Sequence, residues 1–164
     1  MGKRLRPVTA EFLERAPTRL VFVSQLTAEP EQVFRELTED PSTWPLWFTA
    51  LRSAAWTGPP PYGVAAGRAV TLRGGAHFVE SVVVWDEPHR FVYRVEQTNV
   101  PGVLAWMEEW LLAPSANGGT VLRFTIAVDA TTAVRATVRL ARPGVARSFH
   151  AAVARLDARC LGTA

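Results

Sequence analysis

The sequence predicts an α+β fold in which a seven-stranded, curved antiparallel sheet wraps around a long C-terminal helix. Two observations support this prediction. Turn-forming residues recur at strand-length intervals between residues 50 and 129, and from residue 131 onward the apolar residues recur with helical spacing. Such a sheet has one apolar face to cover, and the terminal helix is the large amphipathic element that the sequence offers for this.

The predicted elements follow in a simple order. A first strand is predicted over 20–26, which is rich in β-branched and aromatic residues. Pro30 suits the first position of a short helix that ends before Pro41, and the aromatic stretch 44–48 is expected to be a tight connection. Six further strands are bounded by Gly, Pro, Asn or Asp residues, over 50–57, 66–73, 76–85, 90–98, 103–113 and 120–129.

The C-terminal helix is predicted from an apolar stripe of roughly 29 residues. Because the stripe continues through Pro143 and Gly144, we expect a kinked helix or two nearly collinear pieces. From residue 130 onward six arginines stand against one acid, Asp157, and we interpret them as a solvated outer face. The members of the stripe are Val134, Val138, Ala141, Val145, Phe149, Ala152, Leu156 and Cys160.

Composition excludes several classes of protein. The 164 residues are 48% apolar and 20% charged, which is typical of one globular domain, expected over 18–161 after a polar lead-in over 1–17 with a helical turn near 11–15. The uninterrupted apolar runs, such as 82–85, are far shorter than the about 20 residues of a membrane span, and no secretory signal is evident. We therefore expect a cytoplasmic protein without integral membrane association.

The sequence offers no recognised catalytic motif and no metal site. Its three histidines have no metal-ligand spacing, and the single Cys160 is expected to be an inert, packed thiol. Motifs of zinc hydrolases, serine hydrolases and nucleotide-binding proteins are missing, so we expect no cofactor. The net charge of +3 is modest, and nucleic acid is not an expected partner.

Whether Glu80 faces the inside of the curved sheet depends on two hairpins. A three-residue turn over 74–76 places Glu80 and Tyr93 inside, and we favour it. A two-residue turn at Gly74–Gly75 would instead turn Glu80 outward, since a slip of one residue exchanges the faces of a strand. The pairs expected across the two hairpins are Leu72–Phe78, Val70–Glu80, Val84–Phe91, Val82–Tyr93 and Glu80–Val95.

The next hairpin leaves open which of two adjacent carboxylates faces inward. A loop of six residues after the strand places Glu109 inside together with Met107. A loop one residue shorter places Glu108 inside together with Trp106 and Trp110. An inward carboxyl group would have its pKa raised by desolvation, which suits proton transfer or a hydrogen bond to a ligand hydroxyl.

Several segments resemble those of START/Bet v 1-like proteins, and most of all the polyketide cyclase/dehydrase and lipid-transport group. The segments are AEPEQVF at 28–34, WPLW at 44–47, DEPHRF at 86–91, LLAP at 111–114 and GTVL at 119–122, and the long terminal helix agrees with them. The resemblance covers about residues 18–161 and implies the helix-grip fold. Its members include cyclases, aromatases, hydrolases and carriers of sterols and lipids, so the fold does not settle the function.

The leading functional interpretation is a binding protein for a hydrophobic molecule such as a lipid, polyketide or isoprenoid, held in a cavity between sheet and helix. The first alternative is a cyclase or aromatase in which Glu80, Tyr93 or Glu109 moves protons. The second is an interaction protein that uses its basic terminal helix. Ligand identity and oligomeric state stay open. The residues expected to line the cavity are Trp47, Phe48, Val70, Leu72, Phe78, Glu80, Val82, Phe91, Tyr93, Met107, Glu109, Phe124, Ile126, Val145 and Phe149.

Overall fold

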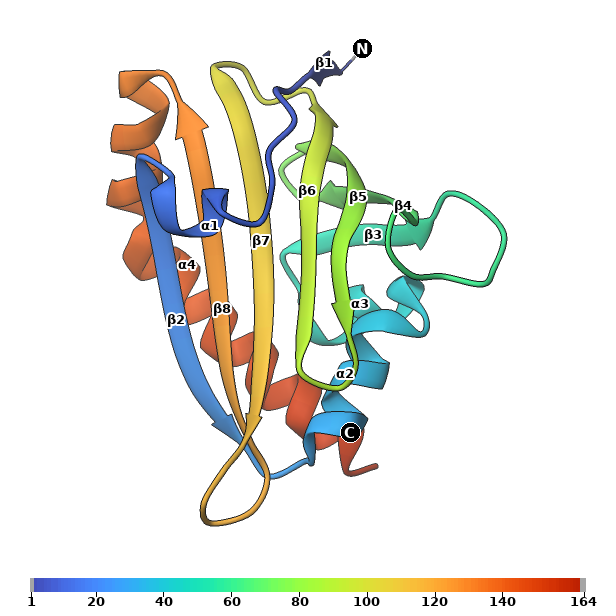
Figure 1. Cartoon of the computed structure of the whole chain (residues 1–164). Coiled ribbons are helices and arrows are strands. Elements are labelled where there is room, and N and C mark those ends of the chain that lie inside the picture. Colours follow the sequence, from blue (N-terminus) through green and yellow to red (C-terminus); the bar gives the residue numbers. More distant parts are fainter. Residues whose placement is uncertain (1, 163–164) are drawn as a thin grey trace.

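The computed structural model describes residues 2–162, and in this range a curved antiparallel sheet packs on a long helix (Figure 1). Seven strands follow one another in the order β2-β8-β7-β6-β5-β4-β3, and a short eighth strand pairs with β6. The strands are β1 (Lys3–Arg4), β2 (Thr18–Leu26), β3 (Leu51–Trp56), β4 (Gly67–Leu72), β5 (His77–Asp86), β6 (Arg90–Thr98), β7 (Val103–Pro114) and β8 (Thr120–Ala130).

Helices α2, α3 and α4 lie on the concave side and at one end of the sheet, whereas α1 lies on the convex face. They are α1 (Phe12–Arg15), α2 (Pro30–Thr38), the 3₁₀ turn η1 (Pro41–Thr43), α3 (Trp44–Trp47) and α4 (Thr132–Cys160). Pro30 is the first residue of α2, where a missing N–H costs nothing. The terminal helix continues through Pro143 as one element of 29 residues. The predicted fold class is therefore confirmed, and the predicted strands agree with the observed ones to within two residues at each end.

The two halves of α4 differ in how they are held. The C-terminal half is buried through Phe149, Ala152, Val153 and Leu156. Its Asp157 carboxylate accepts hydrogen bonds from the backbone N–H groups of Thr27 and Ala28, at 3.0 and 2.8 Å. The N-terminal half is mostly exposed, with Leu140 82% exposed. Helix α4 is thus anchored at its C-terminal end, next to α2 (Figure 1).

The N-terminal segment, predicted as a polar lead-in, packs on the convex face of the sheet. Strand β1 pairs with β6 near Thr98, and the Leu5 N–H donates to the carbonyl of Glu96. Val8 and Leu13 are buried there in a second apolar cluster with Val92, Ala105, Met107 and Ala127 of the sheet. Both faces of the central strands are consequently covered, the concave one by α4 and the convex one by this segment (Figure 1).

The β7–β8 hairpin has the shorter of the two loops considered. Pro114 pairs with Thr120 and Trp110 with Phe124, so β7 extends one residue beyond its predicted end. Gly119, at φ 76°, leaves no space for a Cβ beside the Leu26 carbonyl. This register turns Trp106, Glu108 and Trp110 toward the concave side. The expectation that Met107 and Glu109 face inward is wrong, because a register that differs by one residue turns every side chain of the strand to the other face.

The two preceding hairpins keep the predicted faces but not all predicted pairs. Glu80 lies opposite Val95, and Val82 lies opposite Tyr93, as expected. Phe78 pairs with Val70 and Glu80 with Arg68, two residues away from the predicted partners. A bulge between Val82 and Val84 pairs Val84 with Val92 instead of Phe91. A shift of two residues preserves the face, so Glu80 and Tyr93 still point inward.

Candidate functional site

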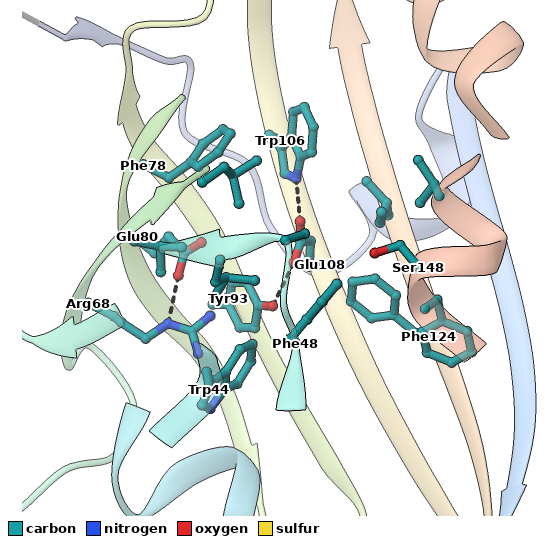
Figure 2. A pocket seen from close by; sticks show the side chains of 17 residues that line it. Trp44, Phe48, Arg68, Phe78, Glu80, Tyr93, Trp106, Glu108, Phe124 and Ser148 are labelled. Atoms are coloured by element: carbon teal, nitrogen blue, oxygen red, sulfur yellow. Dashed lines mark hydrogen bonds and ion pairs between the residues drawn. The ribbon is translucent and has the colours of Figure 1, made fainter. Parts of the chain in front are cut away.

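A cavity of about 230 Å³ lies between the concave face of the sheet, α3 and α4 (Figure 2). Its walls are mainly aromatic and aliphatic, its ionisable groups come from β4, β5, β6 and β7, and Ser148 of α4 adds a hydroxyl group. The residues that line it are Trp44, Phe48, Ala50, Leu51, Arg68, Val70, Leu72, Phe78, Glu80, Tyr93, Trp106, Glu108, Phe124, Ile126, Val145, Ser148 and Phe149.

Ten of the fifteen residues predicted to line the cavity lie on its wall. They are Phe48, Val70, Leu72, Phe78, Glu80, Tyr93, Phe124, Ile126, Val145 and Phe149. Three more, Trp47, Val82 and Phe91, are buried in the same apolar core but do not border the cavity. Trp47 packs against Phe48 with ring centroids 5.8 Å apart, so it supports the wall from behind.

The remaining two predicted residues, Met107 and Glu109, lie on the convex face, away from the cavity. Met107 belongs to the cluster under the N-terminal segment. The Glu109 carboxylate forms ion pairs with Arg90 at 2.7 Å and with Arg123 at 3.7 Å. Because Glu109 cannot reach a molecule in the cavity, it is not a candidate for acid–base chemistry there.

Seven residues of the wall were not among those predicted. Trp106 and Glu108 belong to the register with the shorter loop. Ala50 and Leu51 follow α3, where the path of the chain depends on tertiary packing. The others are Trp44, Arg68 and Ser148. Arg68 lies opposite Glu80 on the neighbouring strand, and Ser148 directly precedes Phe149 on the helix.

Arg68 and Glu80 form a buried ion pair at one side of the cavity. The two residues are directly opposite each other on β4 and β5, and Arg68 Nε donates to Glu80 Oε2 at 2.7 Å. Their side chains are only 2% and 6% exposed. The guanidinium carbon lies 4.2 Å from the Trp44 ring centroid and 4.1 Å from that of Tyr93 (Figure 2). These rings and the carboxylate together compensate the loss of water around the cation.

The second carboxylate, Glu108, is held by neutral donors. Tyr93 Oη donates to Glu108 Oε2 at 2.6 Å, and Trp106 Nε1 donates to Glu108 Oε1 at 2.8 Å. Trp110 Nε1 in turn donates to Tyr93 Oη at 3.1 Å. Figure 2 shows the Glu108 carboxylate between Trp106 and Tyr93, on the strand next to the one that carries Tyr93. The phenol is thus fixed in position and aimed at the carboxylate.

Burial dominates the protonation of this group of residues. It raises the pKa of Glu80 to about 7, although the Arg68 guanidinium opposes the shift and the Glu108 carboxylate adds to it. Burial likewise raises the pKa of Glu108, against the effect of its hydrogen bonds from Tyr93 and Trp106. The pKa of Tyr93 is raised well above its ordinary value by burial and by Glu108. The cavity therefore contains carboxyl groups that hold protons more tightly than exposed ones.

One polar atom of this group of residues forms no hydrogen bond. Among residues 2–162, Arg68 Nη1 is inaccessible to solvent and has no hydrogen-bond partner. An unpaired buried donor is destabilising by about 1–3 kcal/mol.

Other chemistry finds little support in the described range. Within residues 2–162, no three His, Cys, Asp or Glu side chains gather as a metal site would require. Cys160 is half-buried, and burial with the nearby Glu36 and Asp157 carboxylates raises its pKa to about 12, which keeps the thiol protonated. In the same range, no helix is long and apolar enough to cross a membrane.

A curved antiparallel sheet that closes on one long helix and leaves an apolar cavity between them defines the class of START-like ligand-binding domains. Comparison with known proteins agrees with this class. The chain matches the family described as "Polyketide cyclase / dehydrase and lipid transport" over residues 17–160, and it belongs to that family.

Individual relatives support the same fold. An uncharacterized protein of Mycobacterium tuberculosis is 31% identical over 136 residues, which cover 83% of this chain and 80% of that protein. A START superfamily protein from Mycobacterium smegmatis superposes with a TM-score of 0.69 at 11% identity, covering 89% of this chain and 99% of the other. Major latex-like protein 151 from Panax ginseng superposes with a TM-score of 0.68 at 12% identity, covering 87% and 96%. At these identities the two structures speak for the fold alone.

Proposed function

We propose that this protein binds a small hydrophobic molecule in the cavity between its sheet and α4, and that it does so in the cytoplasm. The cavity itself supports this: aromatic and aliphatic side chains form most of the wall, and a few polar groups gather at one side. Apolar burial favours binding by about 25 cal/mol per Å², and a few polar groups fix the orientation of the ligand. No cofactor is part of this proposal.

The size of the cavity narrows the ligand. Its volume of about 230 Å³ is below the roughly 300–1,000 Å³ of sites for drug-sized molecules. The ligand that fits the closed cavity is therefore a small ring system or the apolar end of a longer molecule. A larger ligand requires the exposed N-terminal half of α4 to move outward, since only the other half is anchored through Asp157.

Uptake of a neutral apolar fluorophore, N-phenyl-1-naphthylamine, tests the proposal. We expect saturable binding with one molecule per chain. Val145→Trp fills the cavity from α4 and should weaken binding at least tenfold. Leu140→Trp is the matched control, because Leu140 lies on the same helix and is 82% exposed. No uptake by a folded sample, or equal binding by the two variants, would overturn the proposal.

A cyclase-type enzyme is the second candidate, and one observation favours it. Glu80 and the Tyr93–Glu108 pair present carboxyl and phenol groups with raised pKa values to the cavity, and such groups are common among general acids and bases. If a poly-β-ketone chain is the substrate, Glu80→Gln or Glu108→Gln should abolish its turnover and leave fluorophore binding intact. Glu109→Gln, on the opposite face of β7, is the control. Full turnover by both cavity variants would dismiss the enzyme.

A further inference from the structure

Strand β2 forms one free edge of the sheet. It stands at the end of the strand order and pairs with β8 alone (Figure 1). In an antiparallel ladder, about every second residue of an edge strand directs its backbone N–H and C=O groups away from the neighbouring strand. Among residues 2–162, no backbone group outside β8 forms a hydrogen bond with the backbone of Thr18–Leu26. Over its nine residues, β2 therefore has backbone donors and acceptors that a further strand can pair with.

Arginines from the N-terminal half of α4 follow this edge. Arg139 Nη2 donates to the carbonyl oxygen of Pro17, directly before β2, at 3.2 Å. The guanidinium carbon of Arg142 lies 5.8 Å from the ring centroid of Phe22, in the middle of β2. Arg135 lies about one helical turn before Arg139 on the same side of the helix. Arg139 and Arg142 thus border the concave side of the β2 edge, and Arg135 continues their row.

No carboxylate in residues 2–162 neutralises this row. Within that range, Arg135, Arg139 and Arg142 form no ion pair. Helix α4 contains one acidic residue, Asp157, which lies in its last turn. The positive end of the helix dipole adds to the same field. The β2 edge is therefore positive on its concave side and suits a negatively charged partner.

The convex side of the same edge has an apolar centre. Val23 is 54% exposed, and Val21, two residues earlier on the same face, is half-buried. The exposed side chains of Arg19 and Gln25 lie near the ends of the strand on this face. Successive side chains of a strand point to opposite faces, so an added strand would place every second side chain beside the arginines and the others beside the valines. The edge therefore favours a strand of alternating acidic and apolar residues.

Three occupants of this edge can be compared. A second copy of β2 would bring its own Arg139 and Arg142 to the same place, where like charges repel. A membrane with anionic lipids would satisfy the arginines but offers no row of backbone groups to β2. An extended acidic segment satisfies both, because its backbone continues the ladder and its carboxylates pair with the guanidinium groups.

We propose that the free edge of β2 and the arginines of α4 form a docking surface for an extended acidic segment of a partner protein, which joins the sheet as a further strand. The backbone of the segment pairs with the outer backbone groups of β2. Its acidic side chains reach Arg139 and Arg142, and its apolar side chains pack on Val21 and Val23. None of these four residues lines the cavity, so the proposal goes beyond the proposed function and does not depend on it.

Three fluorescently labelled nine-residue peptides test the proposal by fluorescence anisotropy. The first alternates glutamate and valine, and the second has lysine in place of glutamate. The third has the first sequence with every backbone nitrogen methylated, which removes the hydrogen-bond donors and keeps the charge. We expect the first peptide to bind saturably, with one peptide per chain, and the other two to bind about tenfold more weakly or less. Equal binding of the lysine peptide or of the methylated peptide would overturn the proposal.

Charge reversal at two places on α4 assigns the contact. Arg139→Glu combined with Arg142→Glu should weaken binding of the glutamate–valine peptide by about tenfold or more. Arg147→Glu combined with Arg155→Glu is the matched control, because it makes the same change in net charge at exposed positions of the same helix. The control should change the affinity by less than about threefold, since screening weakens interactions between distant exposed charges. An equal loss in the two double variants would show attraction by net charge alone and would overturn the proposal.

Vesicles of phosphatidylcholine and phosphatidylserine test the membrane as occupant. If the protein binds these vesicles and not the glutamate–valine peptide, or binds neither, the docking proposal is wrong. The proposed function is tested separately, by uptake of N-phenyl-1-naphthylamine. That uptake should be the same in Arg139→Glu with Arg142→Glu as in the wild type, which also confirms that the variant is folded.

Discussion

Glu108 and Glu109 are adjacent on β7 and point to opposite faces of the sheet, and their surroundings differ completely. On the convex face, Glu109 is held by two arginines, at 2.7 and 3.7 Å, that are partly exposed to solvent. On the concave face, Glu108 borders the cavity and is held by a phenol and an indole. On the convex face, the charge of Glu109 is balanced by two arginines of the fold itself. On the concave face, Glu108 accepts hydrogen bonds from neutral side chains only, among the described residues.

The same contrast applies to the two arginine–carboxylate pairs. Both carboxylates are buried, with the side chains of Glu109 and Glu80 7% and 6% exposed, but Arg90 is 35% exposed and Arg68 only 2%. Without Arg68 the buried Glu80 carboxylate has no cation left, whereas without Arg90 the Glu109 carboxylate still has Arg123 at 3.7 Å. The concave face should therefore be far more sensitive to loss of an arginine.

The largest effect is expected for Arg68→Met. It leaves the Glu80 carboxyl group buried without its cation, and we expect the free energy of unfolding at pH 7 to fall by about 3–5 kcal/mol. Arg90→Met on the convex face is the matched control and should lower it by about 1 kcal/mol or less. Urea unfolding followed by tryptophan fluorescence measures both. Equal losses would mean that the two faces do not differ in this way.

A pH dependence sharpens the comparison further. The pKa of Glu80 is raised from 4.5 in the unfolded chain to about 7 in the folded protein, so its contribution to stability is complete below pH 4.5 and is lost as the pH rises through 7. Compared with Glu80→Gln, the wild type should lose stability over this range, at about 1.4 kcal/mol per unit of raised pKa. Unfolding free energies at pH 4.5, 6 and 8 provide the measurement. A difference that stays constant, or grows in favour of the wild type, would contradict the expectation.

Smaller effects are expected when one polar side chain that holds a carboxylate is replaced on each face. Tyr93→Phe deletes the hydroxyl that joins Trp110 Nε1 to Glu108, and it should lower the free energy of unfolding by about 1–3 kcal/mol. Arg123→Met removes the longer ion pair of Glu109 and should change it by less than about 0.5 kcal/mol. Thermal unfolding resolves the order of the two variants, and a reversed order would count against the comparison.

Much of the fold could be predicted from the sequence because its signals are local. Turn residues bound the strands, and the apolar stripe from Val134 to Cys160 defines a helix whose phase continues through Pro143. The N-terminal segment could not be predicted in this way. Its buried residues Leu5, Val8 and Leu13 have no regular spacing, and Val8 and Leu13 are buried because the convex face offers a complementary surface.

The residues of the site could be predicted only where the register of the hairpin could be predicted. Glu80 and Tyr93 were placed on the correct face, since the actual pairing differs from the predicted one by an even number of residues in that region. Glu109 was placed on the wrong face because Pro114 pairs with Thr120 and shortens the loop by one residue. The unpaired Nη1 of Arg68 depends on three strands and α3 together, and no local pattern reports it.

A crystal structure of the protein grown with N-phenyl-1-naphthylamine tests the central claim most directly. The account predicts the aromatic rings of this ligand between the sheet and α4, in contact with Phe48, Phe124 and Val145. A cavity left without the ligand at saturating concentration, or a ligand bound only on the convex face, would contradict it.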